Sequence, residues 1–525
     1  MRKTLLRFIV LSLCVSIFFF SGANAGTPTG EFRIAVGTLE TEAFGPEMGT
    51  MDCKWYQTLL FDSLVGIEPP STDLSSKTGI ATRWTHSPDY KTWTFYLRKG
   101  IKFHNGDNLT AEDVKFTLDR ILGPVGMSVN KATLAETIDK VEVIDPTTVR
   151  IQCKKPDSLL PLSLSENIGT EGMIVPKKYI TEKGDQYFRA HPVGTGPCKL
   201  AEHVPSKHIL FETVDKHWAL GVPRYKYVRI SIVPETMARI GLLQRGEVDM
   251  ILLPRERVEE VRKLGFPIVE DPSQGINLLL MTETWKKEHP TSDLRVRKAM
   301  NLSIDRKAIL QTLFGGIGTL APYSFATRAA LGYEPADPPY PFDPEGAKAL
   351  LREAGYGPAK PCPILIYSFP SVAFAEGEQS IEVIASYWTQ VGFKVNIVKT
   401  PEWGMVKKKI KDGETEGGLY PNNIGGRVWS IPIINALNHG DVTYSHAKIP
   451  ALDEGIDKGL SEIDPEKRKA LAHSVFHTMY ENYLHIPLVE APGTFAVNPK
   501  TIPNYKEWKM GVTPFDFNLE WAIFR

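Results

Sequence analysis

Long hydrophobic runs, cysteine and net charge are all scarce in this 525-residue sequence. After the first 25 residues, no stretch approaches the ~20 consecutive apolar residues that a membrane-spanning helix needs. Lysine plus arginine and aspartate plus glutamate both number 61, and this balance argues against a broad nucleic-acid-binding or membrane-binding surface. The sequence therefore predicts a soluble protein without a nucleic-acid partner.

Motifs of several enzyme classes are also absent. There is no GxSxG elbow, no HExxH, no Walker phosphate loop, no CxxC and no GxGxxG after a strand. His203 with His208 and His473 with His477 form near pairs, but no third ligand accompanies either. We therefore expect a protein that is not an enzyme and holds no metal or cofactor.

The first 25 residues have the pattern of an export signal. A positive start is followed by the apolar run Phe8–Phe20 and by the small-x-small site Ala23-Asn24-Ala25, so we expect cleavage after Ala25. Cleavage removes three cations from 61 and no anion, which leaves 58 Lys+Arg against 61 Asp+Glu and a formal charge of −3. A lipid anchor on Cys14 is the less favoured alternative, because Leu13 is a poor residue for that site.

Four cysteines remain after cleavage: Cys53, Cys153, Cys198 and Cys362. An oxidising compartment permits disulfides, and four cysteines allow three pairings. A chain of this size does not depend on disulfides to fold, so two, one or none are all compatible with the sequence.

The remaining ~500 residues exceed one ordinary domain, so two or three lobes are expected. Two segments are typical of strand–helix–strand units, at 228–253 and at 364–397. Their separation favours two α/β lobes with largely parallel sheets and right-handed crossovers.

Loops that follow strands supply the first candidate site residues. In an open α/β sheet, the loops after strand C-termini face the ligand crevice. Thr38 and Glu40 lie after the predicted strand 32–36, and Phe374 lies between a predicted strand and helix. We expect these three side chains to contact ligand.

A sheet of another kind is predicted at residues 91–103. Trp93, Phe95 and Leu97 alternate with polar residues, which is typical of packing in a half-buried sheet. Thr110 then has the character of an N-cap for a helix with a buried stripe.

Several segments together resemble the bacterial extracellular solute-binding protein family 5. They are the run 84–114, the segment Pro192–Pro197, the segments 293–300 and 304–309, and the helix 343–356. The resemblance covers essentially the whole mature chain in order. It implies an α/β, large periplasmic-binding-protein fold (type II, cluster C), with two lobes around a cleft and a small accessory domain.

The resemblance also implies domain boundaries and partners. Lobe I would comprise 26–72, 191–283 and 489–525, the accessory domain 73–190 and lobe II 284–488, with a hinge near 278–285 and 485–492. The protein would be a periplasmic monomer that delivers a small-molecule or peptide-like ligand to ABC permease subunits in the inner membrane.

One segment departs from the family pattern. Peptide-binding members hold the ligand's α-ammonium with an aspartate, and the resemblance places that position at Gly426. The stretch 420–429 contains no carboxylate and offers Arg427 instead, which suits an anionic or neutral polar group. Glu40, Glu42 or Glu402 are alternative partners for an ammonium. Further ligand candidates in this stretch are Tyr420, Asn423, Gly426 and Trp429.

Two rival functions remain open. An exported hydrolase would turn over a chromogenic substrate, although no spacing of carboxylates singles out a catalytic pair. The same fold could instead act as a sensor or chaperone partner, which the neighbouring genes would reveal.

Overall fold

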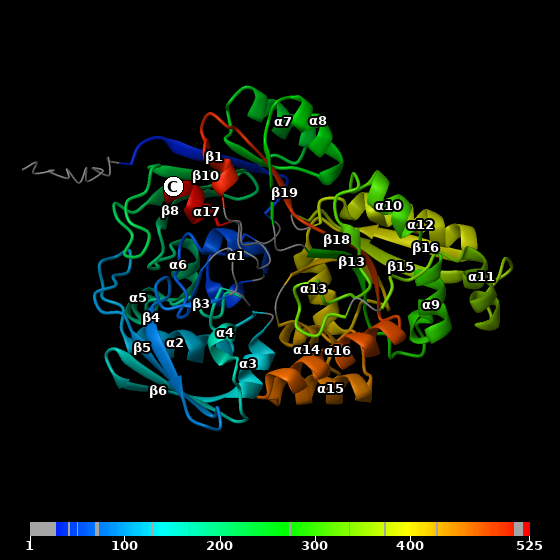
Figure 1. Ribbon diagram of the computed structural model, residues 1–525, viewed down its shortest axis with the longest axis horizontal. Coiled ribbons are helices and arrows are strands. Elements are labelled where there is room, and N and C mark those ends of the chain that lie inside the picture. The colour runs from blue at the N-terminus through cyan, green and yellow to red at the C-terminus, as the bar shows by residue number, and fades with distance from the viewer. Residues whose placement is uncertain are drawn as a thin grey trace, which may run out of the picture.

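A computed structural model describes residues 28–39, 42–49, 51–68, 73–128, 130–166, 169–271, 275–334, 337–371, 374–426, 429–508 and 518–524. Three sheets organise the molecule, and Figure 1 shows them in separate regions. We call the part built on the seven-stranded sheet lobe I, the part built on the six-stranded sheet lobe II, and the part built on the four-stranded sheet the accessory domain. Within the described residues, no helix is long and apolar enough to cross a membrane.

The sheet of lobe I has the strand order β12-β19-β11-β1-β10-β9-β8. Parallel pairing is confined to the centre, where β1 pairs with β10 and β11, and all other pairs are antiparallel. The predicted unit at 228–253 is present as β10, α7 and β11. The bounds are β1 Glu31–Val36, β8 Cys198–Val204, β9 His208–Thr213, β10 Tyr227–Ile232, β11 Met250–Leu252, β12 Ile268–Glu270, β19 Thr494–Val497, α1 Met51–Gln57, α7 Thr236–Gln244, α8 Val258–Lys263 and α17 Leu519–Phe524.

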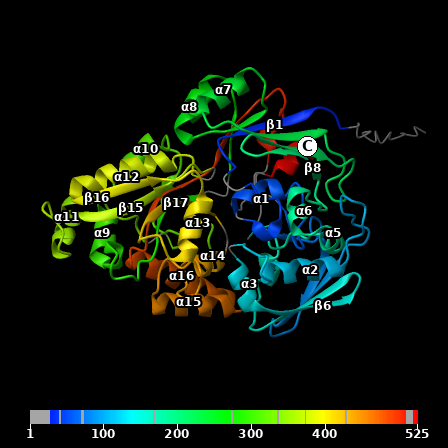
Figure 2. The same ribbon diagram turned by 180° about the vertical axis from the view of Figure 1, so that it is seen from behind.

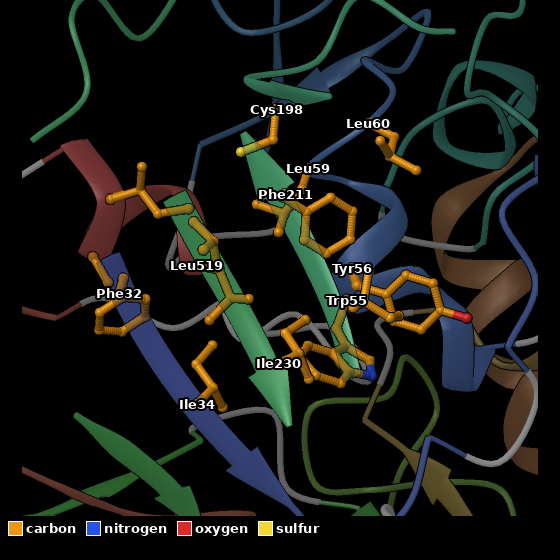
Figure 3. Packing of buried hydrophobic residues seen from close by; sticks show 14 of the residues in the cluster. Phe32, Ile34, Trp55, Tyr56, Leu59, Leu60, Cys198, Phe211, Ile230 and Leu519 are labelled. Carbon is orange, nitrogen blue, oxygen red and sulfur yellow. The ribbon is translucent and has the colours of Figure 1, made fainter. Parts of the chain in front are cut away.

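The core of lobe I lies between this sheet and helix α1 (Figure 3). Ile230 from β10 lies beside Trp55 of α1, Phe32 from β1 lies on the side of Leu519 of α17, and all four side chains are at most 2% exposed. Each buried side chain of this size contributes roughly 1.5–3 kcal/mol. This packing fixes the end of β1, from which the next loop leaves toward lobe II.

The accessory domain has an antiparallel sheet of order β4-β5-β7-β6. The predicted alternation holds, since Trp93, Phe95 and Leu97 are buried and their neighbours on β5 are not. Thr110 and Asp113 form a capping box at the start of α2. The bounds are β4 Ala81–His86, β5 Thr92–Leu97, β6 Ile138–Asp145, β7 Thr148–Cys153, α2 Ala111–Leu122, α3 Lys131–Thr137 and α4 Leu160–Ser163; the short β2 Gly66–Ile67 and β3 Leu74–Ser75 pair nearby, and α5 Lys177–Lys183 and α6 Asp185–Ala190 follow.

The sheet of lobe II has the order β14-β18-β13-β17-β15-β16. The predicted unit at 364–397 is present as β15, α12 and the parallel β16, and Gly392 ends α12 with φ 116°. The bounds are β13 Gly275–Met281, β14 Thr319–Leu320, β15 Cys362–Ser368, β16 Phe393–Lys399, β17 Leu419–Gly425, β18 His485–Ala491, α9 Leu294–Leu302, α10 Arg306–Thr312, α11 Pro344–Glu353, α12 Gly377–Val391, α13 Trp403–Asp412, α14 Ile431–Asn438, α15 Pro450–Ser461 and α16 Pro465–Glu481.

The expectation of largely parallel sheets is wrong. Strand β13 runs antiparallel to both β17 and β18, and β14 runs antiparallel to β18. The physical reason is the path of the chain: β13 enters lobe II and β18 leaves it, so these two adjacent strands run in opposite directions. In lobe II, only β15 with its neighbours β16 and β17 keeps the parallel arrangement, as β1 with β10 and β11 does in lobe I.

The chain passes between the two lobes twice. It leaves β12 at Glu270 and enters β13 at Gly275, and it returns between Ala491 of β18 and Thr494 of β19 (Figure 1). The outward crossing therefore precedes the predicted segment 278–285, whose first residues lie inside β13. The crossings are short, and both join sheet to sheet directly.

No disulfide forms among the four described cysteines. Cys53, Cys153, Cys198 and Cys362 are buried and lie apart on α1, β7, β8 and β15. Burial raises the pKa of the Cys153 and Cys362 thiols to about 12, so both stay protonated at neutral pH. Of the alternatives that the sequence left open, the structure has the one without disulfides.

Candidate functional site

A cleft of about 1010 Å³ lies between lobe I and lobe II. Six loops line it, and each follows the C-terminal end of a strand: β1, β8, β10 and β11 in lobe I, and β15 and β16 in lobe II. Loops in this position border the ligand crevice of open α/β sheets. The topology therefore predicts that the ligand site lies in this cleft.

Glutamates dominate the charge of the cleft. Six of them line it against three cations, Arg239, Arg257 and Lys399. Arg239 is held inside lobe I, where its guanidinium donates hydrogen bonds to the carbonyls of Val233, Pro234 and Leu252. Arg257 and Lys399 have acidic neighbours of their own. The six glutamates are Glu42, Glu235 and Glu256 from lobe I, and Glu378, Glu382 and Glu402 from lobe II.

This excess of carboxylates favours a cationic group on the ligand, because a cleft lined by one sign of charge concentrates the opposite sign. Burial, and then the nearby Glu376, raise the pKa of Glu256, and a cationic group on the ligand would favour the ionised form of this carboxyl. Glu42 is already engaged, since it contacts His203 Nε2 and accepts a hydrogen bond of 2.9 Å from the Ser206 amide.

A buried ion pair joins the lobes beside the cleft. Arg255 Nη1 of lobe I lies 2.6 Å from Glu376 Oε2 of lobe II, and the two side chains are 5% and 1% exposed. The Arg255 amide donates to Glu376 Oε1 at 2.9 Å. Arg255 Nε donates to the carbonyl of Pro492 in the return crossing at 2.6 Å. One guanidinium thus ties both lobes and the crossing segment together.

The accessory domain contacts lobe II at a second place. Asn435 of α14 donates to Thr133 of α3 at 2.9 Å, and Arg468 of α16 donates to Ser158 at 2.5 Å. Leu159 packs against the apolar core of lobe II at the same place. Figures 1 and 2 both show α3 beside α14 and α15. Lobe II is therefore held at the cleft and at the accessory domain.

The structure brings two of the predicted site residues to the cleft. Thr38 lines it from lobe I, and Phe374 lines it from lobe II, where its ring lies 6.2 Å from Phe314. Glu40 and Arg427 lie outside the described residues. Glu42 and Glu402, the alternative partners for an ammonium, both line the cleft.

The remaining predicted residues lie at β17 and just after it. Tyr420 is 1% exposed and its hydroxyl lies 2.9 Å from His446 Nε2. Trp429 is 4% exposed in the lobe II core, with the Arg468 guanidinium over its ring. Asn423 donates to Asn277 at 3.0 Å, and the buried Gly426 follows the end of β17. In this conformation both rings pack in the core.

Sequence reasoning missed the Arg255–Glu376 pair and most of the cleft glutamates. The rule that selected Thr38 also applies to the loops after β10 and β11, and it would have found Glu235 and Glu256. The ion pair has no local signal, because its two residues are 121 positions apart in the chain.

Comparison with known proteins assigns the class. The model of the bacterial extracellular solute-binding proteins, family 5, middle region, matches residues 76–429. The chain belongs to this family of extracellular solute-binding proteins.

Characterised relatives cover most of the chain. It is 28% identical to the heme-binding protein A of Haemophilus influenzae, over 87% of this chain and 86% of that protein. It is 26% identical to a glutathione-binding protein of Salmonella choleraesuis, over 87% and 88%. It is 28% identical to the dipeptide-binding protein of Escherichia coli, over 71% and 72%.

Solved structures share the fold. The periplasmic binding protein DppA of Helicobacter pylori, in complex with the peptide STSA, has a TM-score of 0.80 at 21% identity, covering 90% of this chain and 94% of that one. The binding protein MoaA of A. tumefaciens, in complex with mannopinic acid, has a TM-score of 0.78 at 23% identity, covering 90% and 95%. The fold is thus the large periplasmic-binding-protein fold, with two lobes and an accessory domain, and the chain is a bacterial extracellular solute-binding protein.

Proposed function

We propose that the cleft captures a polar solute of peptide-like size that carries a cationic group, and that the protein delivers it unchanged to the permease. The observation that carries this proposal is the set of six glutamates that line the cleft, four from the segments that follow strand ends and two, Glu378 and Glu382, from helix α12. The volume of about 1010 Å³ lies at the upper end of small-molecule sites, which supports a ligand larger than a single amino acid.

Thr38 and Phe374 are the proposed contacts in the described part of the cleft. Phe374 lies at the lobe II wall of the cleft but is only 1% exposed, so it supports this wall from the core and offers ligand little of its ring. From the sequence we add Glu40, Asn423, Gly426 and Arg427. The segment 420–429 has no carboxylate, so it would meet a neutral or anionic part of the same solute. The ligand would then carry both signs of charge.

We further propose that the protein acts as a monomer and that its leader is removed after Ala25. The lobes would comprise the segments that build each sheet, with lobe II beginning at Gly275 and ending at Ala491. Intact-mass analysis of periplasmic protein should give a chain that begins with Gly26, and a lipid-modified Cys14 would contradict this.

Mass spectrometry of the solute that co-purifies with the mature protein tests the central proposal. We expect an intact solute with an amine, guanidinium or other cation, which returns to the stripped protein in calorimetry. Recovery of a purely anionic solute would contradict the charge argument, and recovery of cleavage products would favour an exported hydrolase.

A further inference from the structure

Three buried oxygen atoms in lobe II have no hydrogen-bond partner among the described residues. They are the Oε2 atom of Glu490 and the hydroxyls of Thr319 and Thr327. Glu490 is 2% exposed and Thr327 is 3% exposed. Buried polar atoms are almost always hydrogen-bonded, and an unmade bond costs free energy. A bound group with several hydrogen-bond donors would therefore satisfy all three oxygens.

The fold brings these oxygens together. Thr319 of β14 pairs directly with Glu490 of β18, so the two side chains lie on the same face of the sheet. Gly318 permits this approach, because its φ is +113° and a Cβ there would lie 2.5 Å from the Glu490 carbonyl oxygen. Thr327 lies near this pair because its neighbour Arg328 donates its backbone amide to Glu490 Oε1 at 3.2 Å.

This cluster lies at the end of lobe II that faces lobe I. Glu490 is the second-to-last residue of β18, next to the return crossing. Glu490 and Ile424 are both register partners of Ile276, so they lie on one face, two strand spacings or about 10 Å apart. The loop that contains Gly426 begins just beyond Ile424. A second loop of lobe II, the one that precedes β14, also approaches lobe I, because a Cβ on Gly315 would lie 3.1 Å from the Arg255 carbonyl oxygen.

The cluster matches the hydrogen bonds of a primary ammonium. An ammonium has three donors and no acceptor, and its charge complements the carboxylate. A divalent metal is a poorer match, because no group of three His, Cys, Asp or Glu residues is present in the described part of the chain. Arg328 Nε lies 4.0 Å from Glu490 Oε2, beyond hydrogen-bonding distance, and its side chain is 58% exposed.

We propose that Glu490, Thr319 and Thr327 form a subsite for a primary ammonium group of the bound solute. This inference rests on the proposed function and deepens it, because it assigns the cationic group of the ligand to Glu490, a lobe II carboxylate in addition to the six that line the cleft. In this proposal, the exposed Arg328 guanidinium binds an adjacent anionic group of the same solute.

Methyl NMR of the full mature protein, labelled on threonine and stripped of solute, tests the subsite. The probes are methylammonium and tetramethylammonium, which share a charge but differ in N–H donors. We expect methylammonium to shift the Thr319 and Thr327 methyl signals in a saturable way and tetramethylammonium to leave them unchanged. Glu490→Gln should weaken the methylammonium response at least tenfold, whereas Glu481→Gln, at the exposed end of α16, should not change it.

Unshifted Thr319 and Thr327 signals, or an equal response in Glu490→Gln, would overturn the subsite and leave a buried water as the occupant. If Glu490→Gln melts early, the double variant Thr319→Val/Thr327→Val decides, because it removes both hydroxyls at nearly constant volume. We expect it to lose at least tenfold in methylammonium affinity, and unchanged affinity would overturn the proposal. Small-angle scattering with the co-purified solute measures closure of the two lobes, and it therefore tests the proposed function independently of this subsite.

Discussion

Buried histidines make individual residues of this protein sensitive to acid. Burial lowers the pKa of His446 to about 3 and that of His104 to about 4, and it also lowers the pKa of His485. His446 and His485 lie in contact in lobe II, with their ring centroids 5.8 Å apart. A protein of the bacterial periplasm meets the pH of its surroundings, so these groups matter for stability.

The sign of the pH effect follows from the lowered pKa of His446. The unfolded chain takes up a proton near pH 6.5 and the folded chain does not, so stability is full above pH 6.5 and falls as the pH drops toward 3. Between pH 6.5 and 5, this amounts to roughly 2 kcal/mol for His446 alone. Urea unfolding of wild type and His446→Asn at pH 7 and pH 5 measures it. The variant should lose less between the two pH values, and the exposed-site control His191→Asn should behave as wild type.

Helix α12 shows at the scale of one element how the sequence determines structure. Gly392 ends it in the left-handed region, with φ 116°, which disfavours every residue that has a Cβ. Gly392→Ala should therefore cost about 1 kcal/mol or more in urea unfolding. Gly357→Ala is the matched control, because Gly357 has no positive φ and no atom within 4 Å of an added Cβ, and its effect should stay within about 0.5 kcal/mol. Equal losses in both variants would contradict the role of the helix end.

Elements of this kind were predictable from the sequence because their signals are local. The units around α7 and α12, the strand β5 and the Thr110 cap all follow from periodicity and turn residues within a few positions. The order of strands is not local: β19 lies between β11 and β12, although more than 200 residues separate it from both. For the site, Thr38 and Phe374 followed from the rule on strand ends, whereas Glu376 and Glu490 depend on how distant segments meet.

At the scale of the whole molecule, a buried ion pair joins the two lobes. Arg255→Met should leave the charge of Glu376 buried and unpaired, at a cost of roughly 3–5 kcal/mol in urea unfolding. The double variant Arg255→Met/Glu376→Leu should recover most of that loss, because neither charge remains. Arg257→Met is the neighbouring control: its partner Glu260 is exposed, so the change should stay below about 1 kcal/mol. A double variant as unstable as Arg255→Met would show that packing, and not charge, is lost.

Ligand should also change the shape of the whole molecule. Two short crossings connect the lobes, and a solute that contacts both lobes favours the arrangement in which they are close. Small-angle scattering should show a smaller radius of gyration when the co-purified solute is returned to stripped protein. Binding confirmed by calorimetry without a change in radius would indicate lobes held rigidly by the contacts of Arg255 and Arg468.

The position of β19 has a consequence for how the chain is made. Lobe II is one continuous segment between the two crossings, whereas the sheet of lobe I needs β19 between β12 and β11. The sheet of lobe II also waits for a late interior strand, because β18 lies between β14 and β13 and ends only at Ala491. During synthesis, each sheet therefore keeps two open strand edges until the end of the chain emerges. Both lobes complete their sheets late and almost together.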